Sequence, residues 1–511
     1  MATGAAHPGV WVPPDEKTFA RRWLVLVVLC VSLVIVVVGN TTLNVALPTL
    51  QRELGASQTA LQWMVDAYAL VFAGLLFTAG AMGDRFGRKG ALQAGLGIFF
   101  LGSVGAGLAG STAGIIAGRA VMGIGAAFIM PSTLSILTNV FPPEERGKAI
   151  GIWAGLSGGG AALGPLASGF LLKHYSYGSV FFVNLPIIVG AFVAGYVLLP
   201  KSKDVEQGRL DPVGALLSVA GISAVVYAII EGPDEGWLSL PTLGVATVGL
   251  AILGTFAWWE LRTSHPMLDL RFFRNPRFSV ASGGITLVFF AMFGVFFLIT
   301  QYFQLVLGYT PIEAAVRQLP ISVALMLVAP NAPRLIPRFG VNRVVASGLT
   351  LVASGLALQV TFGIDTPYFL LVPPMMIMAA GMGATVSPLT SSIMSSVPQG
   401  RAGVGSAMND TTRELGGALG VAVLGSLMQS KYSAVIAGVP GLAPQAREIA
   451  GSGLGGALRV AGSLGDPVAA QQFVTTAREG FLSGMHVAVL VGAAVVAVAA
   501  VLVYRTLPGP H

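Results

Sequence analysis

Ionisable residues are rare in this sequence, and those that interrupt its apolar stretches are the ones able to do chemistry. Charged residues make up 10% of the 511 residues, whereas hydrophobic residues make up 54%. Charge is costly in hydrocarbon, so such residues usually serve a function, and a carboxyl group among them can take up and release a proton. The candidates for proton coupling are Asp66, Arg119, Asp410, Arg413 and Glu414.

These candidates fall into two groups. Asp66 lies about six residues, or ~9 Å of helix, inside its apolar stretch. Asp410 and Glu414 are four residues apart and share one helix face, with Arg413 beside them, so that contact with Arg413 could switch proton affinity between two states. We rank Asp66 first, and Glu414 with Asp410 second. The alternative for the second group is a static, mutually paired cluster.

Membrane-spanning helices are the elements that must position these side chains. Apolar windows of about twenty residues recur along the chain, each long enough to cross a ~30 Å hydrocarbon layer. The chain is therefore predicted to be an all-α polytopic membrane protein, and its 67 glycines indicate close helix packing. Fourteen spans are predicted, at 23–47, 60–82, 91–110, 113–138, 149–172, 179–199, 212–230, 241–259, 278–307, 314–337, 344–363, 368–396, 403–428 and 481–504.

The basic residues predict the orientation of the chain. If the N-terminus is cytoplasmic, most of the 29 lysines and arginines fall in cytoplasmic loops, as the positive-inside rule requires. We therefore expect both termini in the cytoplasm and the protein in the plasma (inner) membrane. The same pattern accounts for the basic pI of about 9.6 without nucleic-acid binding.

An internal repeat indicates two related halves. The tripeptide Arg-Phe-Gly at 85–87 recurs at 338–340, at nearly the spacing that separates Arg146 from Arg401. Parallel six-span repeats are typical of transporters that rock two bundles around a central site. The predicted organisation is a cytoplasmic tail 1–22, a six-helix bundle 23–199, a linker with two additional spans 200–277, a second six-helix bundle 278–504 that includes an extracytoplasmic loop 429–480, and a cytoplasmic tail 505–511.

The segment GDRFGRKG at 83–90 concentrates charge between the second and third spans. Gly87 permits a tight reversal of the chain. Arg88 and Lys89 lie where cytoplasmic positive charge is favoured. Topology alone would explain these basic residues, but it does not explain Asp84.

Together with Gly80, this segment resembles the signature of the major facilitator superfamily, in particular its fourteen-span drug:proton antiporters. The resemblance implies that Asp84 braces the two halves by facing the N-terminus of the thirteenth span near Gly403. An anion at a helix N-terminus contributes ~0.3 to 1 kcal/mol, and up to ~2 kcal/mol when partly buried. The conformational latch implied in this way comprises Gly80, Asp84, Arg85, Gly87, Arg88 and Lys89.

Two further segments resemble motifs of the same family. Arg119, followed by Gly123 and Gly125, is similar to its buried-arginine motif, with Met122 where glutamine is usual. The alternative is an arginine that extends to the membrane surface. The run GPLASG at 164–169 is similar to the antiporter motif, with a serine in place of one glycine. The alternative here is plain helix packing. The residues assigned to the antiporter helix are Gly160, Gly164, Pro165 and Gly169.

The first span also carries a resemblance, with one departure. The residues from Asn40 to Pro48 resemble the first-span motif of the fourteen-span group. That group commonly has an aspartate just before this motif, where the present chain has Gly39. The acid is a candidate for proton or cation handling, so its absence leaves the substrate class open.

Substrate contacts are implied only by segment. The family lines its cavity with the first, fourth and fifth spans and their counterparts in the second half. The alternative for methionine and phenylalanine side chains is ordinary packing or lipid contact. The candidates are Asn44, Trp63, Tyr68, Met122, Met130, Asn409 and the neighbourhood of Phe289 and Phe290.

The function expected from the sequence is proton-coupled efflux of amphiphilic small molecules, such as drugs or dyes, by alternating access. The chain has no phosphate-binding loop, nucleophile elbow or metal-spaced histidine cluster, so we expect no enzyme activity, no metal and no cofactor besides a proton gradient. Its expected partners are the substrate, protons and membrane lipid, with no nucleic acid, and the chain is expected to be a monomer. The alternatives are an exporter of a lipid or endogenous metabolite, or a channel or sensor.

Overall fold

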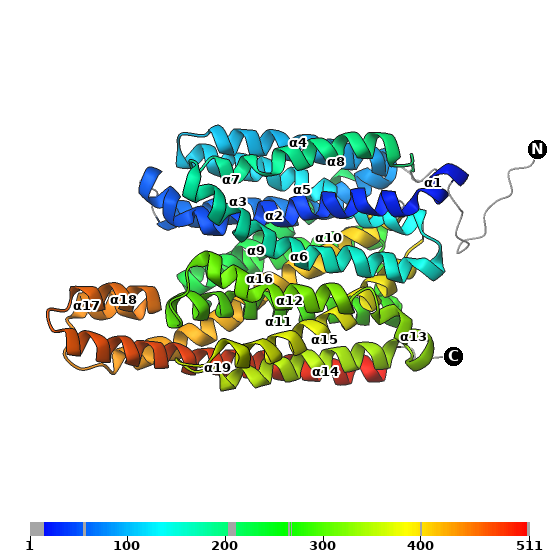
Figure 1. Ribbon diagram of the computed structural model, residues 1–511. Helices are drawn as coiled ribbons and strands as arrows, with labels where there is room; N and C mark the ends of the chain where they lie inside the picture. Colours follow the sequence, from blue (N-terminus) through cyan, green and yellow to red (C-terminus); the bar gives the residue numbers. More distant parts are fainter. Residues whose placement is uncertain are drawn as a thin grey trace, which may run out of the picture.

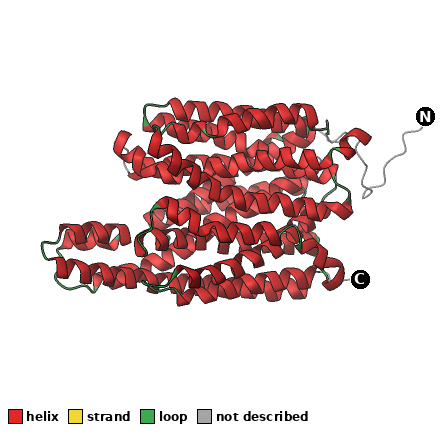
Figure 2. Cartoon of the chain, viewed as in Figure 1, coloured by secondary structure: helices red, strands yellow, loops and turns green. Residues whose placement is uncertain are grey.

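The computed structural model describes residues 15–54, 58–202, 211–263, 266, 268–398 and 401–507. Over these ranges the chain is almost entirely helical and contains no strand (Figure 2). In lipid every backbone polar group must find its partner within the protein, and a helix achieves this within one segment. The predicted all-α fold class is confirmed.

The first half of the chain folds into a bundle of long helices. The sixth predicted span, 179–199, is divided at Val183 into two helices, because Pro186 has no N–H to bond to the carbonyl of Phe182. The helices are α1 (Glu16–Ala20), α2 (Arg22–Leu54), α3 (Gln58–Phe86), α4 (Arg88–Leu108), α5 (Thr112–Val140), α6 (Pro143–His174), α7 (Ser179–Phe182) and α8 (Asn184–Leu198).

Two inserted helices, α9 (Pro212–Glu235) and α10 (Leu240–Arg262), lead to the second bundle. The second bundle comprises η1 (Leu270–Arg274), α11 (Pro276–Gln301), the π-helical turn η2 (Tyr302–Val306), α12 (Pro311–Val328), η3 (Ala332–Leu335), α13 (Ile336–Phe339), α14 (Val341–Leu358), η4 (Gln359–Thr361), α15 (Tyr368–Ser395), α16 (Ala402–Ala437), α17 (Pro444–Gly451), α18 (Leu454–Ser463) and α19 (Pro467–Thr506).

The helices account for most of the predicted spans. Among the described residues, 12 helices are long and apolar enough to cross a membrane. A bent pair, Ile312–Val328 with Ala332–Phe339, makes a thirteenth candidate with a 45° break. The 32-residue α6 is equally long and packs among them. The total of fourteen spans and the exact domain boundaries stay predictions.

The two halves lie against each other along a few helix pairs. Figure 1 shows α2 to α8 in blue to green on one side and α11 to α19 in green to red on the other. They meet where α3 and α5 pack on α16, and where α6 packs on α12 and α15. Small residues allow this approach, since a Cβ atom at Gly80 would lie 2.7 Å from the carbonyl oxygen of Gly403.

The last two long helices extend further than the sequence predicts. Much of the predicted loop 429–480 is helical, because α16 continues to Ala437 and α19 already begins at Pro467. Between them, α17 and α18 lie beside the start of α19, and these segments together project beyond the rest of the bundle at one end (Figure 1). Leu454 and Ala457 on α18 are buried, so an apolar face holds this projection together. The start of α2 and the end of α19 lie at the opposite end (Figure 1).

The close approach at Gly80 gives a first prediction. Gly80→Ala should lower the free energy of unfolding by about 1 to 3 kcal/mol, because the new methyl group overlaps α16. Gly97→Ala in α4 is the control, since its Cβ would meet nothing within 4 Å. Thermal unfolding in detergent measures both variants. Equal melting temperatures for the two would contradict tight packing at this seam.

Candidate functional site

The carboxylate of Asp84 joins the two halves of the protein. Asp84 is fully buried at the end of α3. Its oxygens accept hydrogen bonds from the backbone N–H of Gly403 at 2.8 and 2.9 Å and of Val404 at 3.2 Å. The guanidinium of Arg88, four residues further along the chain at the start of α4, donates to the same carboxylate at 2.7 Å. The contact expected between Asp84 and the start of the thirteenth span is therefore present.

Local features of α16 explain why this acid comes from another helix. The first N–H groups of a helix lack partners within it and carry partial positive charge. Arg401 precedes α16 and offers no side-chain cap, so these donors need an acceptor from elsewhere. Gly403 leaves room for it, because a Cβ atom there would lie 2.7 Å from the carboxylate of Asp84. The role of the contact as a conformational latch stays a prediction.

Three further residues of the 83–90 segment have a definite structural role or neighbour. Gly87 adopts a φ of 114°, a left-handed conformation that separates α3 from α4. Lys89 donates to the carbonyls of Tyr196 at 2.6 Å and Leu199 at 3.0 Å, and so caps the end of α8. Arg85 lies 5.5 Å from the ring centroid of Phe86. Topology alone therefore does not account for the basic residues.

A second buried charge, Arg119, lies inside the first half. Its side chain is fully buried and donates to the carbonyls of Met64 at 2.9 Å and Gly39 at 2.8 Å. Its guanidinium also lies 4.3 Å over the ring of Tyr68. Asp66 is near enough to attract it electrostatically. The alternative of an arginine that extends to the membrane surface is wrong.

The position of Gly39 shows how the chain accommodates the missing aspartate. The carbonyl oxygen of Gly39 takes one hydrogen bond from Arg119. A Cβ atom at this residue would lie only 2.6 Å from the ring of Phe99, so an acidic side chain would require that ring to move. Arg119 is therefore held here by backbone oxygens, an aromatic face and the attraction of Asp66.

The third buried charge, Arg413, crosses the boundary between the halves. It lies 3.7 Å from Asp410 on its own helix and 3.5 Å from the hydroxyl of Ser157 on α6. Its guanidinium is 4.6 Å from the ring centroid of Phe289 on α11 and 5.3 Å from that of Trp153 on α6. One arginine thus contacts residues of both bundles. The planar guanidinium of arginine is suited to such contacts, because it stacks on aromatic rings.

Asn409 links this cluster to α15 by hydrogen bonds. Its amide donates to Asp410 at 3.2 Å, and its carbonyl oxygen accepts from Thr390 on α15 at 3.0 Å. Glu414 lies near enough to interact electrostatically with Arg413 and also with Tyr68 of the first half. The structure therefore brings the two predicted charge clusters into one buried polar system, in which Asp66 and Glu414 are partly exposed. It extends from Asp66 and Arg119 through Tyr68 to Glu414, Arg413 and Asp410.

Several predicted cavity residues pack elsewhere. Trp63 faces Tyr227 of the inserted α9, with ring centroids 6.1 Å apart. Met122 is buried against the backbone of α4, where it would touch a Cβ at Gly102. Met130 is also buried. For these methionines the structure supports the packing alternative. Asn44 belongs to α2, but its side chain lies outside the described part of the structure.

The predicted antiporter helix, α6, packs tightly on both of its sides. Gly164 adjoins Thr41, and the hydroxyl of Ser168 donates to the carbonyl of Thr42 at 2.7 Å, which fixes α6 to α2. Gly169 adjoins Ile312 on α12. Gly160 faces the side chains of α2, and Pro165 lies within the continuous helix. Close packing explains this spacing, while the antiport role stays a prediction.

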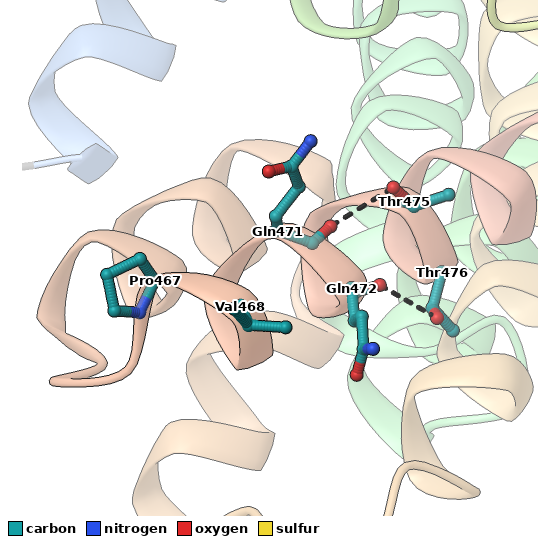
Figure 3. Close-up of a pocket in the computed structure, with 6 residues that line it drawn as sticks. All are labelled: Pro467, Val468, Gln471, Gln472, Thr475 and Thr476. Atoms are coloured by element: carbon teal, nitrogen blue, oxygen red, sulfur yellow. Dashed lines mark hydrogen bonds between the residues drawn. The ribbon is translucent and has the colours of Figure 1, made fainter.

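A surface hollow on the projecting end is separate from the polar system. Figure 3 shows its lining residues, all from α19: Pro467, Val468, Gln471, Gln472, Thr475 and Thr476. The two threonine hydroxyls donate to carbonyls one turn earlier in the same helix, at 3.0 and 3.1 Å. Among the described residues no cluster of three His, Cys, Asp or Glu could hold a metal.

Comparison with known proteins assigns the family. The sequence family called the Major Facilitator Superfamily matches residues 29–421 of this chain. The chain belongs to this superfamily. It is therefore a multi-pass membrane transporter of small molecules and not an enzyme.

Curated relatives match over nearly the whole chain. The multidrug efflux pump LfrA of Mycolicibacterium smegmatis is 33% identical, covering 96% of this chain and 97% of its own. The tetracenomycin C resistance and export protein of Streptomyces glaucescens is 32% identical over 99% and 94%. The methyl viologen resistance protein SmvA of Salmonella typhimurium is 34% identical over 92% and 94%.

A solved structure supports the fold independently. The proton:xylose symporter XylE, bound to 6-bromo-6-deoxy-D-glucose, aligns with a TM-score of 0.61 over 96% of each chain. Its sequence identity is 14%, so this likeness concerns the fold alone. The predicted superfamily fold is confirmed.

Sequence reasoning missed Trp153, Ser157 and Thr390. The first two lie one turn apart on α6 and contact Arg413 from the opposite half. Their spacing gives one helix face, but nothing in the sequence indicates which charged residue that face meets. Only the tertiary structure, which brings these two side chains of α6 within reach of Arg413 on α16, reveals the pairing.

The stacking of Arg413 gives a prediction. Arg413→Lys keeps the charge but loses the planar contact with Phe289 and Trp153, so the free energy of unfolding should fall by about 1 to 2 kcal/mol. Arg447→Lys is the control, because Arg447 is exposed on α17 and bonds only a nearby carbonyl. Unfolding in detergent is the measurement. A loss no larger than that of the control would contradict the inter-bundle contact.

The contact between Asp84 and the start of α16 gives another prediction. Asp84→Asn removes the charge that meets α16, so the α3–α16 seam should open about 5 to 30 times more often, as a loss of ~1 to 2 kcal/mol implies. A cysteine replacing buried Ala407, in a chain with Cys30→Ala, reports opening by its alkylation rate. Asp269→Asn is the control, since it removes a more exposed acid 4.0 Å from Arg401. Unchanged alkylation in Asp84→Asn would count against the latch.

Proposed function

We propose that this chain exports amphiphilic small molecules, such as drugs or dyes, across the plasma membrane in exchange for protons. Relatives named for multidrug efflux, for tetracenomycin C export and for methyl viologen resistance support this cargo class. The basic residues support an orientation with both termini in the cytoplasm. The transporter acts as a monomer and uses the proton gradient in place of a cofactor.

One observation carries the proposal, namely the buried polar system shared by the two halves. Arg413 reaches Trp153 and Ser157 across the boundary, and Glu414 interacts with Tyr68. Ionisable groups placed inside a membrane protein mark proton relays and substrate paths. Because these groups belong to two bundles, a change in their charge alters the attraction between the bundles.

The mechanism follows from this arrangement. Proton uptake by Asp410 or Glu414 removes a negative charge beside Arg413 and weakens the contact with it. Arg413 is then held less firmly, and the two bundles can rock about the central site. Asp84 closes the cytoplasmic end when its carboxylate meets the start of α16. Proton entry in this cycle drives the substrate outward.

Asp66 remains the first candidate for the proton-carrying residue. It lies on α3, the helix whose last turn also carries Asp84, and within electrostatic reach of Arg119. Proton uptake at Asp66 would weaken its attraction for Arg119. It would thereby loosen the hold of Arg119 on α3, the helix that also carries the latch residue Asp84. Asp410 and Glu414 are the second candidates on the other half.

A second candidate cargo is a lipid or an endogenous metabolite. The observation that favours it is Gly39, whose missing side chain leaves the middle of α2 uncharged and packed against Phe99. Purified protein in liposomes separates the possibilities. Dye or lipid efflux that collapses an imposed pH gradient supports an exporter of one class or the other, whereas permeation without proton movement would indicate a channel.

The role of Asp66 is directly testable. Asp66→Asn cannot release a proton, so gradient-driven export in liposomes should fall at least tenfold, while substrate exchange without a gradient continues. Asp365→Asn is the matched control, because Asp365 is exposed in the turn between α14 and α15. Export at the parental rate in Asp66→Asn would remove this residue from the proton path.

A further inference from the structure

The inserted helix α9 packs against α3 of the first bundle. A Cβ atom at Gly74 would collide with the hydroxyl of Ser223 on α9, so the two backbones lie at close range. One side of the same contact is aromatic, with Trp63 and Tyr227 at a centroid distance of 6.1 Å. Small residues and aromatic pairs of this kind fix one membrane helix on another. Helix α9 therefore moves with α3.

The end of this insert also contacts the second bundle. Trp237, in the turn between α9 and α10, donates its indole N–H to the hydroxyl of Ser426 on α16 at 3.0 Å. The turn begins at Gly236, whose φ of 93° requires glycine. The indole lies over Gly232, where a Cβ atom would be 2.9 Å from the ring. The last turn of α9 thus holds the indole of Trp237 in the position from which it donates to Ser426 on α16.

The Trp237 contact and the Asp84 contact lie at opposite ends of α16. Asp84 meets Gly403, and Ser426 follows 23 residues later (426 minus 403), or ~35 Å along the helix. Both contacts join the first bundle to the second, one directly and one through α9. The α3–α16 seam is therefore bridged at two places in this structure, by Asp84 at the start of α16 and by the α9–α10 turn at Ser426.

We propose that the inserted pair is a clamp on the α3–α16 seam, with Trp237 and Ser426 as positioning residues that hold the end opposite Asp84 closed. This inference rests on the rocking cycle of the proposed function, in which the seam opens at one end at a time. Because α9 is fixed to α3, opening the seam at the Trp237 end separates the indole from Ser426. Breaking the bond is thus part of that opening step.

The two inserted helices contribute unequally to this clamp. In α10 only 17% of the apolar window is buried, against 39% in α9, so α10 is the more lipid-exposed helix. Helix α9 packs on both α3 and α16 at the level where the halves meet (Figure 1). In the clamp, the role of α10 is to lead the chain back from the turn between α9 and α10. It also holds that turn, and Trp237 with it, in position.

Spin-label distances test the clamp on the full-length transporter. In a Cys30→Ala chain, labels at Gly110→Cys and Asp365→Cys report opening at the Trp237 end. Labels at Lys201→Cys and Arg343→Cys report opening at the Asp84 end. All four residues are exposed. Trp237→Phe removes the donor and keeps an aromatic ring, whereas Ser426→Ala removes the acceptor with little change in volume.

Each variant should raise the ratio of open to closed molecules at the Trp237 end about threefold. This corresponds to about 0.7 kcal/mol, since a tenfold change corresponds to about 1.4 kcal/mol. The double variant should add little beyond either single change, since both break one bond. Opening at the Asp84 end should not increase. Trp258→Phe is the matched control, because Trp258 is an exposed tryptophan of α10 that stacks on Arg262.

Two results would overturn the clamp. One is an unchanged open fraction at the Trp237 end in Ser426→Ala, the milder of the two substitutions. The other is an equal effect in Trp258→Phe, which would point to a general loss of packing. Distances are measured without substrate or a pH gradient. A chain that responds as expected but transports without protons would therefore contradict the proposed coupling and leave the clamp standing.

Discussion

The structure depends on one interaction, the meeting of the Asp84 carboxylate with the first N–H groups of α16. A helix start buried without partners is unfavourable, and α16 has no side-chain cap of its own. The acid that satisfies it belongs to the other half of the chain, 319 residues away in sequence. The first turn of α16 is therefore complete only while the two bundles touch. This makes the contact suitable for a latch, because separating the bundles exposes donors on one side and a carboxylate on the other.

The buried polar system depends on the same closeness of the bundles. Arg413 would keep only the carboxylates of its own helix if α6 and α11 did not supply Trp153, Ser157 and Phe289. Aromatic faces and a neighbouring carboxylate replace the water that a guanidinium has at the surface. Such a group is sensitive to its surroundings, since the removal of one negative charge beside it alters the balance that keeps it buried. Coupling between proton uptake and bundle movement needs this sensitivity.

The inserted helices add a third link between the bundles. They interrupt the sequence between two six-helix repeats, and α9 occupies the level where those repeats meet. The Asp84 contact is charged and fully buried, whereas the contact between Trp237 and Ser426 is a neutral hydrogen bond near the surface. A strong and a weak contact at opposite ends of α16 would make the two ends differ in how readily they open.

The sequence by itself determined the all-helical membrane fold, the duplicated halves and the contact of Asp84 near Gly403. Hydrophobic windows, repeated tripeptides and the family motif are local patterns, and backbone hydrogen bonding in lipid permits few other solutions. Only the tertiary structure decided that Arg119 is buried, that Trp63 faces the insert, and that Tyr68 and Glu414 belong to one polar system. It also decided how far α16 and α19 extend into the predicted loop 429–480. These features depend on which helix faces meet, and a helix face in a membrane carries no mark of its partner because lipid and protein are equally apolar.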